Sequence, residues 1–479
     1  MTEPIEARDP RTGDVDYRVT PPTDDELDRV EQSIRTSQEG WREEGLEHRL
    51  DVLQRWKDEI EANRERLTDR VAADTGRRGI SATEVDALVS MIDRVCEQAP
   101  AVLTPDPLGE ASISSIRLDP ELVPYPLVGV VSPWNFPLLL SAIDTVPALA
   151  AGCGVIVKPS EVTPRFVEPL RETIAAVPEL DAVLEYVPGA GQTGAAVVDR
   201  ADAVAFTGSV ETGKKIARQA AGSVKPTFLE LGGNDPAIVL AGADVDAATS
   251  AILWASTVNT GQGCQSIERV YVHEGEYDRF VDQLLEKAAD VGLAYPDEDS
   301  GRLGPFISRE QADIVQRQLD DAAEKGATIR HGGKIETHGG GRWLRPTVLT
   351  DVDHSMAVAT EETFGPVIPV ASFETADDAV ELANDTVYGL SGAVFGETEA
   401  AAIDVGRRIE AGAISINDAS LTAVLQEGEK QAFKQSGLGQ SRFGPKGIDR
   451  FLRRKMQMVK TDAVPDPWWY DVDESWLTE

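Results

Sequence analysis

The sequence predicts an α/β protein with two doubly wound, Rossmann-like parallel sheets and a separate β-ribbon. From residue 127 onward, short apolar runs alternate with longer stretches of helical spacing, which is typical of parallel strands joined by helices. The chain has 479 residues, too many for one hydrophobic core, so two or three domains are expected. Two segments, near residues 113 and 460, instead alternate polar and apolar residues, as exposed strands do.

The first hundred residues are expected to form amphipathic surface helices. Between about residues 23 and 101, apolar residues such as Leu53, Trp56 and Ile60 recur three or four positions apart, with charged residues between them. Residues 112–117 then alternate like a strand, and their polar face predicts a ribbon projecting from the body. Residues 455–464 alternate weakly and are expected to pair with this ribbon.

The middle of the chain supplies the two sheets. Strands of the first are expected at 127–132, 154–157, 183–187 and 203–206, with helices at 138–150, at 165–177 and from about 210. A second unit is expected up to about residue 416, with strands at 269–272, 327–329, 343–349, 366–373, 392–395 and 414–417 and helices at 276–291 and 309–325. Ligands bind such sheets beyond the carboxyl ends of the strands.

The charge of the chain excludes some classes of partner. The formal net charge is −36, with 82 acidic and 46 basic residues spread along the sequence. Such a field repels nucleic acid and anionic membranes, so neither is expected as a partner. We interpret the excess as a surface adapted to high salt, where a screening length of about 3 Å at 1 M removes the self-repulsion.

Three cysteines, Cys96, Cys153 and Cys264, cannot form a disulfide framework, and no Cys/His ligand spacing predicts a metal site. The polar, acidic N-terminal stretch is not a signal peptide. The longest uncharged run, residues 122–143, contains several prolines and is expected to be strand and loop rather than a membrane span. A cytoplasmic protein is therefore expected.

Residues 228–270 carry the chemistry. Glu230 lies in an apolar run before Gly232 and Gly233, and burial raises the pKa of a carboxyl group towards the range of a general base. Cys264 lies on a Gly-rich loop, where solvent and backbone N–H groups are expected to favour the thiolate. Base and thiolate together suit covalent catalysis. Each residue alone also fits a structural role, as a paired buried acid or an inert core thiol.

Three polar residues follow predicted strands of the first sheet. Lys158 and Glu161 suit ribose or phosphate oxygens, and Ser209 precedes a helix whose free N–H groups suit a pyrophosphate. Helix caps at Ser160 and Ser209 are the simpler interpretation. The loop at 208–213 is not a GxGxxG fingerprint.

Seven motifs in order resemble the NAD(P)-dependent aldehyde dehydrogenase superfamily, over about residues 21–460. They are PWNFP at 133–137, KPSE at 158–161, FTGSVETG at 206–213, LELGGNDP at 229–236, GQGC at 261–264, EETFGPV at 361–367 and NDTVYGLSG at 384–392. The resemblance implies that Cys264 attacks an aldehyde, that the Asn135 amide and a backbone N–H hold the oxyanion, and that Glu230 activates water to hydrolyse the thioester to a carboxylic acid.

The resemblance also implies a cofactor, NAD, with NADP as the less favoured possibility because Glu161 would face a 2′-phosphate. Lys158 and Glu161 would hold the adenine-side ribose, Ser209 the pyrophosphate and Glu362 the nicotinamide ribose, with Phe364 packed near it. The full set of implied cofactor-binding residues is Trp134, Lys158, Ser160, Glu161, Gly208, Ser209, Gly213, Leu231, Glu362 and Phe364.

The implied domains are an NAD-binding domain at residues 1–106 and 126–231, a catalytic domain at 232–452, and an oligomerisation ribbon and tail at 107–125 and 453–479. A homodimer or homotetramer is expected, acting on a small-molecule aldehyde.

Three positions depart from the family pattern. Asp144 stands where many relatives carry lysine, so a proton-relay role for that lysine does not carry over. The PFGG turn and the later GRE are absent, with 431–437 and 439–444 in their places, which leaves the substrate tunnel undefined. Gln265, Trp254 and Leu425 are candidates to line it, although core packing is the favoured interpretation of Trp254.

Two other functions fit the same fold. In a CoA-acylating semialdehyde dehydrogenase, CoA would take the acyl group from Cys264, and Glu230 would then have no water to activate. A non-catalytic structural or binding paralogue is also conceivable, because fold does not fix function. The presence of Cys264, Glu230 and Asn135 favours the hydrolytic enzyme over both.

Overall fold

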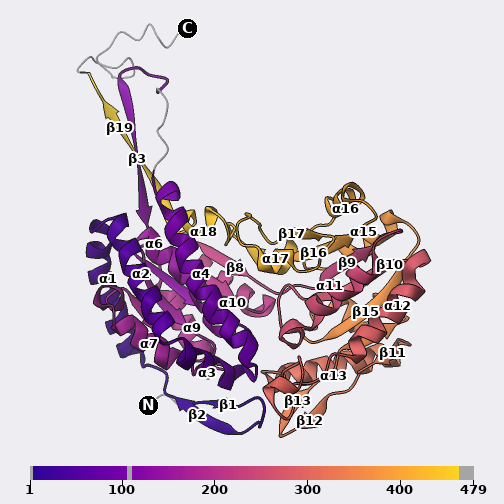
Figure 1. The fold of residues 1–479 in the computed structure, drawn as a ribbon. Helices are drawn as coiled ribbons and strands as arrows, with labels where there is room; N and C mark the ends of the chain where they lie inside the picture. The colour runs from indigo at the N-terminus through magenta and orange to yellow at the C-terminus, as the bar shows by residue number, and fades with distance from the viewer. Residues whose placement is uncertain (1–3, 105–110, 463–479) are drawn as a thin grey trace.

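The computed structural model describes residues 4–104 and 111–462. Two halves, each built on its own sheet, lie side by side, and a long two-stranded ribbon projects from the first half (Figure 1). The predicted α/β fold with parallel sheets is confirmed.

The first sheet has six strands in the order β18-β8-β7-β4-β5-β6. All neighbours are parallel except β18 and β8. The strands are β4 (Leu127–Val131), β5 (Gly154–Lys158), β6 (Leu184–Tyr186), β7 (Ala203–Thr207), β8 (Thr227–Glu230) and β18 (Gly437–Leu438). The helices of this half are α1 (Asp24–Glu43), α2 (Leu46–Ala62), α3 (Arg64–Thr75), α4 (Arg78–Val102), α5 (Pro137–Ala142), α6 (Thr145–Ala151), α7 (Val167–Ala175), α8 (Pro178–Asp181), α9 (Gly191–Arg200), α10 (Val210–Ala221) and α18 (Lys446–Asp449).

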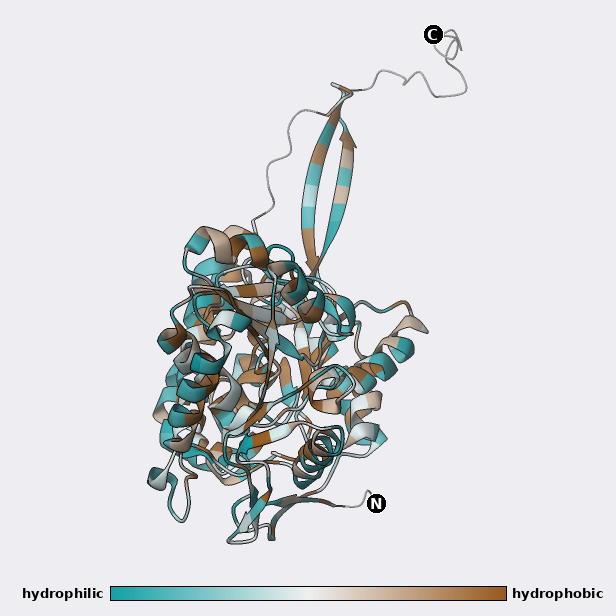
Figure 2. Ribbon diagram, turned by 90° about the vertical axis from the view of Figure 1, so that its right-hand side faces the viewer, coloured by the Kyte–Doolittle hydropathy of each residue, from teal (hydrophilic) through white to brown (hydrophobic). Residues whose placement is uncertain are grey.

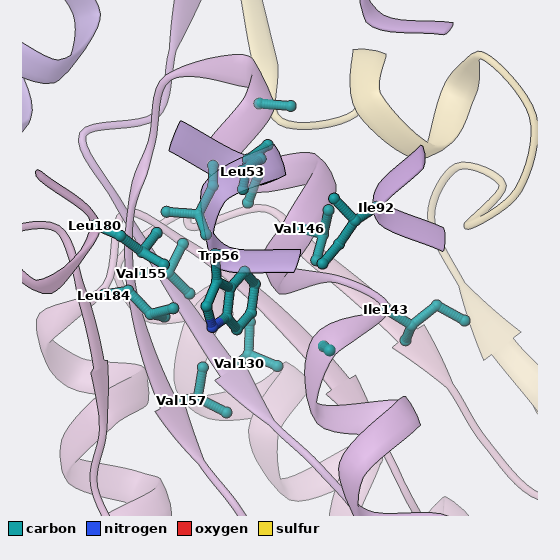
Figure 3. Packing of buried hydrophobic residues seen from close by; sticks show 14 of the residues in the cluster. Leu53, Trp56, Ile92, Val130, Ile143, Val146, Val155, Val157, Leu180 and Leu184 are labelled. Atoms are coloured by element: carbon teal, nitrogen blue, oxygen red, sulfur yellow. The ribbon is translucent and has the colours of Figure 1, made fainter. Parts of the chain in front are cut away.

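Helices α2, α4 and α6 pack on this sheet through a large apolar core. Trp56 of α2 is fully buried and lies beside Val130, Val155 and Val157 of the sheet (Figure 3). Its indole N–H donates to the Thr173 hydroxyl of α7 at 3.0 Å, so the polar atom is satisfied within the core. A Trp-to-Ala change at such a site typically costs about 3–5 kcal/mol.

The second sheet has seven strands in the order β11-β14-β15-β10-β9-β16-β17, parallel except for β11 with β14. Its strands are β9 (Asp235–Val239), β10 (Ile267–His273), β11 (Thr328–His331), β14 (Thr347–Thr350), β15 (Val367–Phe373), β16 (Ser391–Phe395) and β17 (Ala413–Ile416). Its helices are α11 (Val245–Thr257), α12 (Glu274–Ala289), α13 (Arg309–Glu324), α14 (Ala357–Thr360), α15 (Ala376–Asn384), α16 (Glu399–Gly406) and α17 (Leu421–Val424). Short 3₁₀ turns lie at Val258–Gly261, Glu298–Ser300 and Lys434–Ser436.

Strands β3 (Ile116–Pro124) and β19 (Leu452–Lys460) form the projecting ribbon. They pair antiparallel along their whole length, from Ile116 with Lys460 to Pro124 with Leu452, so the expected pairing with the C-terminal segment is confirmed. The first strand was expected at 112–117 but lies at Ile116–Pro124, because residues 112–115 form bends and turns. Apolar and polar residues alternate along both strands (Figure 2). Residues 105–110 and 463–479 of the predicted ribbon and tail lie outside the described residues.

Four features differ from the sequence prediction. An N-terminal hairpin of β1 (Ile5–Arg8) and β2 (Val15–Val19) was not expected, nor was the small pair β12 (Glu336–His338) and β13 (Gly341–Trp343). The single helix expected at 138–150 is two, α5 and α6, which break next to Asp144. Strand β18 returns to the first sheet from within the segment 232–452. Over the described residues, the structure has no helix with the length and apolar character that a membrane crossing needs.

Candidate active site

The chain passes from the first sheet to the second between Glu230 and Asp235, and the candidate site lies around this link. Glu230 ends β8, and Asp235 begins β9. Gly232 and Gly233 lie between them and have no side chains, so groups from later in the chain can approach this backbone closely. A Cβ on Gly232 would collide with the Glu362 carboxylate, and a Cβ on Gly233 would collide with the carbonyl oxygen of Cys264. The link therefore brings together the base, the cysteine and Glu362, which are far apart in the sequence.

Cys264 follows a sharply bent loop. After α11, Asn259 and Thr260 adopt left-handed backbone conformations, with φ of 54° and 58°, and Gly261 follows with φ of 70°. A Cβ on Gly261 would overlap the backbone of Gly365, so only glycine fits there. Cys264 itself is partly exposed.

The expectation that this loop favours the thiolate is wrong for the structure as it stands. Burial, together with the negative charges of Glu362 and Asp235, raises the pKa of the Cys264 thiol to about 12. Arg442 opposes this shift but does not overcome it. Cys264 therefore needs a further positive charge or a nearby base before it becomes a nucleophile.

Asn135 is buried and tied to the cysteine loop. Its side-chain amide donates to the carbonyl of Gln262 at 3.1 Å, two residues before Cys264. The backbone carbonyl of Asn135 accepts from the Asn259 side-chain amide at 3.0 Å and from the Arg77 guanidinium. The amide has a second N–H beyond the one given to Gln262, as an oxyanion donor requires.

A buried pair from the helical layer holds the Asn135 segment, and sequence reasoning missed it. Glu84 of α4 accepts from the backbone N–H groups of Leu138 and Leu139 at 3.1 and 3.2 Å, at the start of α5. It also pairs with Arg77 at 3.4 Å. An acidic residue in the amphipathic pattern of α4 is the only signal in the sequence, and it resembles an ordinary surface position.

Glu230 has the raised pKa that its sequence setting predicts, although its surroundings are not purely apolar. Burial raises the pKa of its carboxyl group, while Arg442, Arg450 and Lys430 lower it. The two arginines are buried and hold Asp144 between them. Arg442 donates to both Asp144 oxygens at 3.2 and 2.8 Å and also to the Thr207 hydroxyl, and Arg450 donates to Asp144. Asp144 thus belongs to a buried cluster of charges beside the candidate base.

The predicted adenine-side residues lie together at the end of β5. Lys158 is buried, and its amine donates to Glu161 at 2.8 Å. Ser160 accepts from Val162 N–H at 3.2 Å in a turn, and the next helix begins only at Val167, so Ser160 does not cap a helix. Ser209 does cap one: its hydroxyl accepts from Thr212 N–H at 3.3 Å at the exposed start of α10.

Two glycines predicted to bind the cofactor, Gly208 and Gly213, lie near the start of α10. A Cβ on Gly213 would lie 2.5 Å from the side chain of Leu231, and one on Gly208 would lie 2.5 Å from the ring of Phe206. The absence of side chains at both positions keeps the first turn of the helix close to the sheet. Leu231 is fixed in turn by its N–H bond to the Ser436 carbonyl at 2.8 Å.

Glu362 lies against the link, and Trp134 contacts the nearby Phe364. The rings of Trp134 and Phe364 form an edge contact with centroids 5.4 Å apart. Glu362 accepts from Gly233 N–H at 3.1 Å. Burial and the neighbouring Glu268 raise the pKa of Glu362 to about 8.

Glu268 and Asp235 are buried acids that sequence reasoning also missed. Glu268 accepts from the N–H groups of Thr363 and Phe364, both at 2.7 Å, and so fixes the turn in which Phe364 has a left-handed φ of 53°. Asp235 accepts from the N–H and hydroxyl of Ser391. Trp254, expected in the core, is 51% exposed, so that interpretation is wrong.

Comparison with known proteins gives one consistent result. The family model described as the aldehyde dehydrogenase family matches residues 1–457. A 2-hydroxymuconic semialdehyde dehydrogenase of Pseudomonas sp. (strain CF600) is 33% identical over 451 residues, covering 90% of each chain. The chloroplastic betaine aldehyde dehydrogenase of Atriplex hortensis is 39% identical over 352 residues, 72% of this chain and 69% of that one.

Solved structures agree with this result. PutA of Anabaena variabilis is 53% identical, with a TM-score of 0.96 over 98% of this chain and 100% of that one. A betaine aldehyde dehydrogenase of Staphylococcus aureus, solved in complex with NAD⁺, is 30% identical with a TM-score of 0.91 over 98% of this chain and 94% of that one. The chain therefore belongs to the aldehyde dehydrogenase family and is an NAD(P)-dependent oxidoreductase that acts on aldehydes.

Proposed function

We propose that this enzyme oxidises its aldehyde to a carboxylic acid by the hydrolytic route, with Cys264 as nucleophile, Asn135 as oxyanion donor and Glu230 as general base. The observation that carries the proposal is the link at Gly232 and Gly233. A Cβ on Gly233 would collide with the Cys264 carbonyl, so the Cys264 backbone lies against the link, just after Glu230 ends β8. The Asn135 amide is bonded within the same cysteine loop.

The steps follow from these groups. The Cys264 thiolate adds to the aldehyde carbon, and the new oxyanion takes N–H donation from Asn135 and the Cys264 backbone. Loss of hydride from this thiohemiacetal leaves a thioester on Cys264. Glu230 then takes a proton from water as the water attacks the thioester, and the acid leaves while the sulfur regains its proton.

The residues present fit a bound dinucleotide. Gly213 and Gly208 let the first turn of α10 pack closely against Leu231 and Phe206, and the exposed Ser209 end offers N–H groups for a pyrophosphate. Lys158 and Glu161 would hold the adenine-side ribose, and Glu362 the nicotinamide ribose beside Trp134 and Phe364. When bound, NAD supplies the hydride acceptor and a positive charge that stabilises the Cys264 thiolate. The Glu161 carboxylate favours NAD over NADP.

Glu230 distinguishes hydrolysis from transfer to CoA. A base beside the thioester is needed to activate water, whereas a CoA thiol arrives as its own nucleophile. The raised pKa of the Glu230 carboxyl suits such a base. Formation of acyl-CoA on addition of CoA, at a rate above that of acid release, would contradict the hydrolytic route.

The test uses three proteins and one assay. NADH formation is followed by absorbance with a panel of aldehydes, for the unaltered enzyme and for Cys264→Ala and Asn135→Ala. Cys264→Ala is expected to give no dehydrogenase turnover, and Asn135→Ala to lose about 10²–10³ in kcat, because one oxyanion donor is removed. Retained activity in Cys264→Ala would contradict the assignment of the nucleophile.

The ribbon is proposed to join copies of the chain, into a dimer or a tetramer. Met456 and Met458 share one face of β19 with their cross-strand partners Pro120 and Leu118, and the two methionines are 40% and 72% exposed. An isolated two-stranded ribbon is only marginally stable in water, so this apolar face is expected to pack on another subunit. Adaptation to high salt is also part of the proposal, based on the net charge of −36, and so is a cytoplasmic location, for which the charge is no evidence.

A further inference from the structure

Lys430 is an amine close to the candidate nucleophile that the mechanism does not use. It directly precedes the segment 431–437, which stands where the family has its PFGG turn. Its Nζ donates to the Thr422 carbonyl and lies 4.5 Å from the centroid of the Phe443 ring. The side chain is partly exposed, and it makes no ion pair with any residue of 4–104 or 111–462.

A short path of contacts leads from Lys430 to Cys264. Thr422, whose carbonyl accepts from Lys430, donates its hydroxyl to Ser391 at 3.3 Å. Ser391 is bonded to Asp235 through both its hydroxyl and its N–H. The Asp235 carboxylate and the backbone carbonyl of Cys264 both lie where a Cβ on Gly233 would stand, so the path ends at the Cys264 backbone.

The charge of Lys430 also acts on the reacting groups. Burial lowers the pKa of the Lys430 amine, and the charges of Glu230, Cys264 and Asp235 offset this shift only in part. In return Lys430 lowers the pKa of the Glu230 carboxyl. The charge of Lys430 is therefore close enough to Glu230 and Cys264 to act on both groups.

The surface next to Lys430 is apolar. Leu421, Val424 and Leu425, on and just after α17, are 40%, 63% and 54% exposed, and they flank the residue whose carbonyl holds the amine. Arg94 of α4 donates to Gln426 in the same segment, and its charge interacts with the exposed Glu427. Apolar side chains beside the Lys430 amine match a molecule with a hydrocarbon chain and an anionic end.

We propose that Lys430 binds the carboxylate of an aldehyde that carries an acid group at its far end, so that the enzyme selects ω-carboxylated aldehydes over neutral ones of the same length. This rests on the proposed function, since it names the substrate class of that site. The carboxylate replaces the Thr422 carbonyl as the partner of the amine, while the chain of the substrate lies along the apolar residues. A cationic aldehyde is disfavoured because it meets a like charge.

The test is a ratio of specificity constants. For each protein kcat/KM is measured with NAD for 4-oxobutanoate and for butanal, which have the same number of carbons and differ in the carboxylate. The unaltered enzyme is expected to favour 4-oxobutanoate. Lys430→Gln is expected to lower this ratio about 10- to 100-fold, because a charge-assisted hydrogen bond is lost. The ratio is the readout, since the charge of Lys430 also acts on Cys264 and Glu230.

Three controls make the outcome decisive. Lys334→Gln removes a positive charge from an exposed loop outside the site and should leave the ratio unchanged. Lys430→Arg should keep most of the preference, and Lys430→Glu should lower the ratio below that of Lys430→Gln, because a negative charge repels the carboxylate. An unmoved ratio in Lys430→Gln and Lys430→Glu, with both aldehydes oxidised, would overturn the substrate proposal alone. An unaltered enzyme that forms no NADH with any aldehyde would overturn the proposed function instead.

Discussion

At the scale of single residues, the thiol of Cys264 is the first point to test. Because its pKa is raised to about 12, the thiolate fraction should rise about tenfold per pH unit from pH 7 to pH 10 in the enzyme without cofactor. Alkylation of Cys264 by iodoacetamide, followed by peptide mass spectrometry, should accelerate in the same proportion. A rate that reaches a plateau near neutral pH would contradict the raised pKa.

Arg442 is the residue whose charge lowers the pKa of Glu230 most. Arg442→Gln should therefore raise the pKa of the Glu230 carboxyl further. Under conditions where acid release limits the rate, the rising limb of the pH profile of kcat should then move to higher pH. The free energy of unfolding should also fall by about 3–5 kcal/mol, because Asp144 loses one partner of a buried ion pair.

Two variants separate these effects of Arg442. Arg442→Lys retains the charge and should leave the pH midpoint near that of the unaltered enzyme, even if its stability falls. Arg342→Gln removes an exposed arginine that pairs with Asp313 at 3.1 Å and should change neither quantity. Equal pH midpoints for Arg442→Gln and Arg442→Lys would rule out an electrostatic effect of this arginine on Glu230.

At the scale of elements, the turn after α14 depends on Glu268. Its carboxylate accepts from two successive N–H groups, whereas a glutamine side chain in its place would offer one acceptor oxygen and an N–H₂ group. Glu268→Gln should loosen the turn that carries Glu362 and Phe364 and raise KM for NAD about tenfold with a smaller change in kcat. Steady-state kinetics with varied NAD measure both, with the neighbouring Glu361→Gln as the control. Equal KM values for Glu268→Gln and the unaltered enzyme would contradict this role.

The ribbon of β3 and β19 is the element that should set the assembly. Met458→Asp places a charge on its apolar face and should lower the molar mass found by light scattering after size exclusion, because a charge at a buried contact carries a desolvation cost of several kcal/mol. Met458→Leu keeps the face apolar and should leave the mass unchanged. An oligomer unaffected by Met458→Asp would place the contact elsewhere.

At the scale of the whole molecule, the charge of −36 should make stability depend on salt. Raising KCl from 0.15 M to 1 M shortens the screening length from about 8 Å to about 3 Å and weakens the repulsion among the acidic residues. The thermal midpoint should rise steadily over this range, and more than in sorbitol of equal osmolality, which does not screen charge. A midpoint that falls or stays constant with KCl would contradict salt adaptation.

The sequence predicted the parallel sheets because their strands are apolar runs between helices, a pattern that depends on neighbours in the chain. It could not predict strand β18, which is only two residues long and pairs with β8 from more than 200 positions away. The helix break at Asp144 was missed for a related reason. Its partners Arg442 and Arg450 lie 298 and 306 residues away, so the chain shows only an acidic residue in an apolar stretch.

The same limit applies to the site. The predicted cofactor and catalytic residues lie in family motifs, whereas Glu84 and Glu268 lie outside them and act through backbone N–H groups that only the folded chain brings to them. Asp235 stands in the motif LELGGNDP, but its partner Ser391 is likewise brought to it only by folding. The expected direction of the Cys264 pKa shift was also wrong, because the sequence shows the glycines of the loop but neither the burial of the thiol nor the acids around it.

Covalent transfer through Cys264 followed by hydrolysis at Glu230 is the central claim, and the variant Glu230→Gln tests it most directly. Rapid mixing with NAD and an oxidisable aldehyde should give one NADH per active site and then almost no turnover, with the Cys264 peptide heavier by the acyl group in intact and peptide mass spectra. Full steady-state turnover without a trapped adduct, or a variant that gives neither a burst nor an adduct while the unaltered enzyme turns over, would contradict the account.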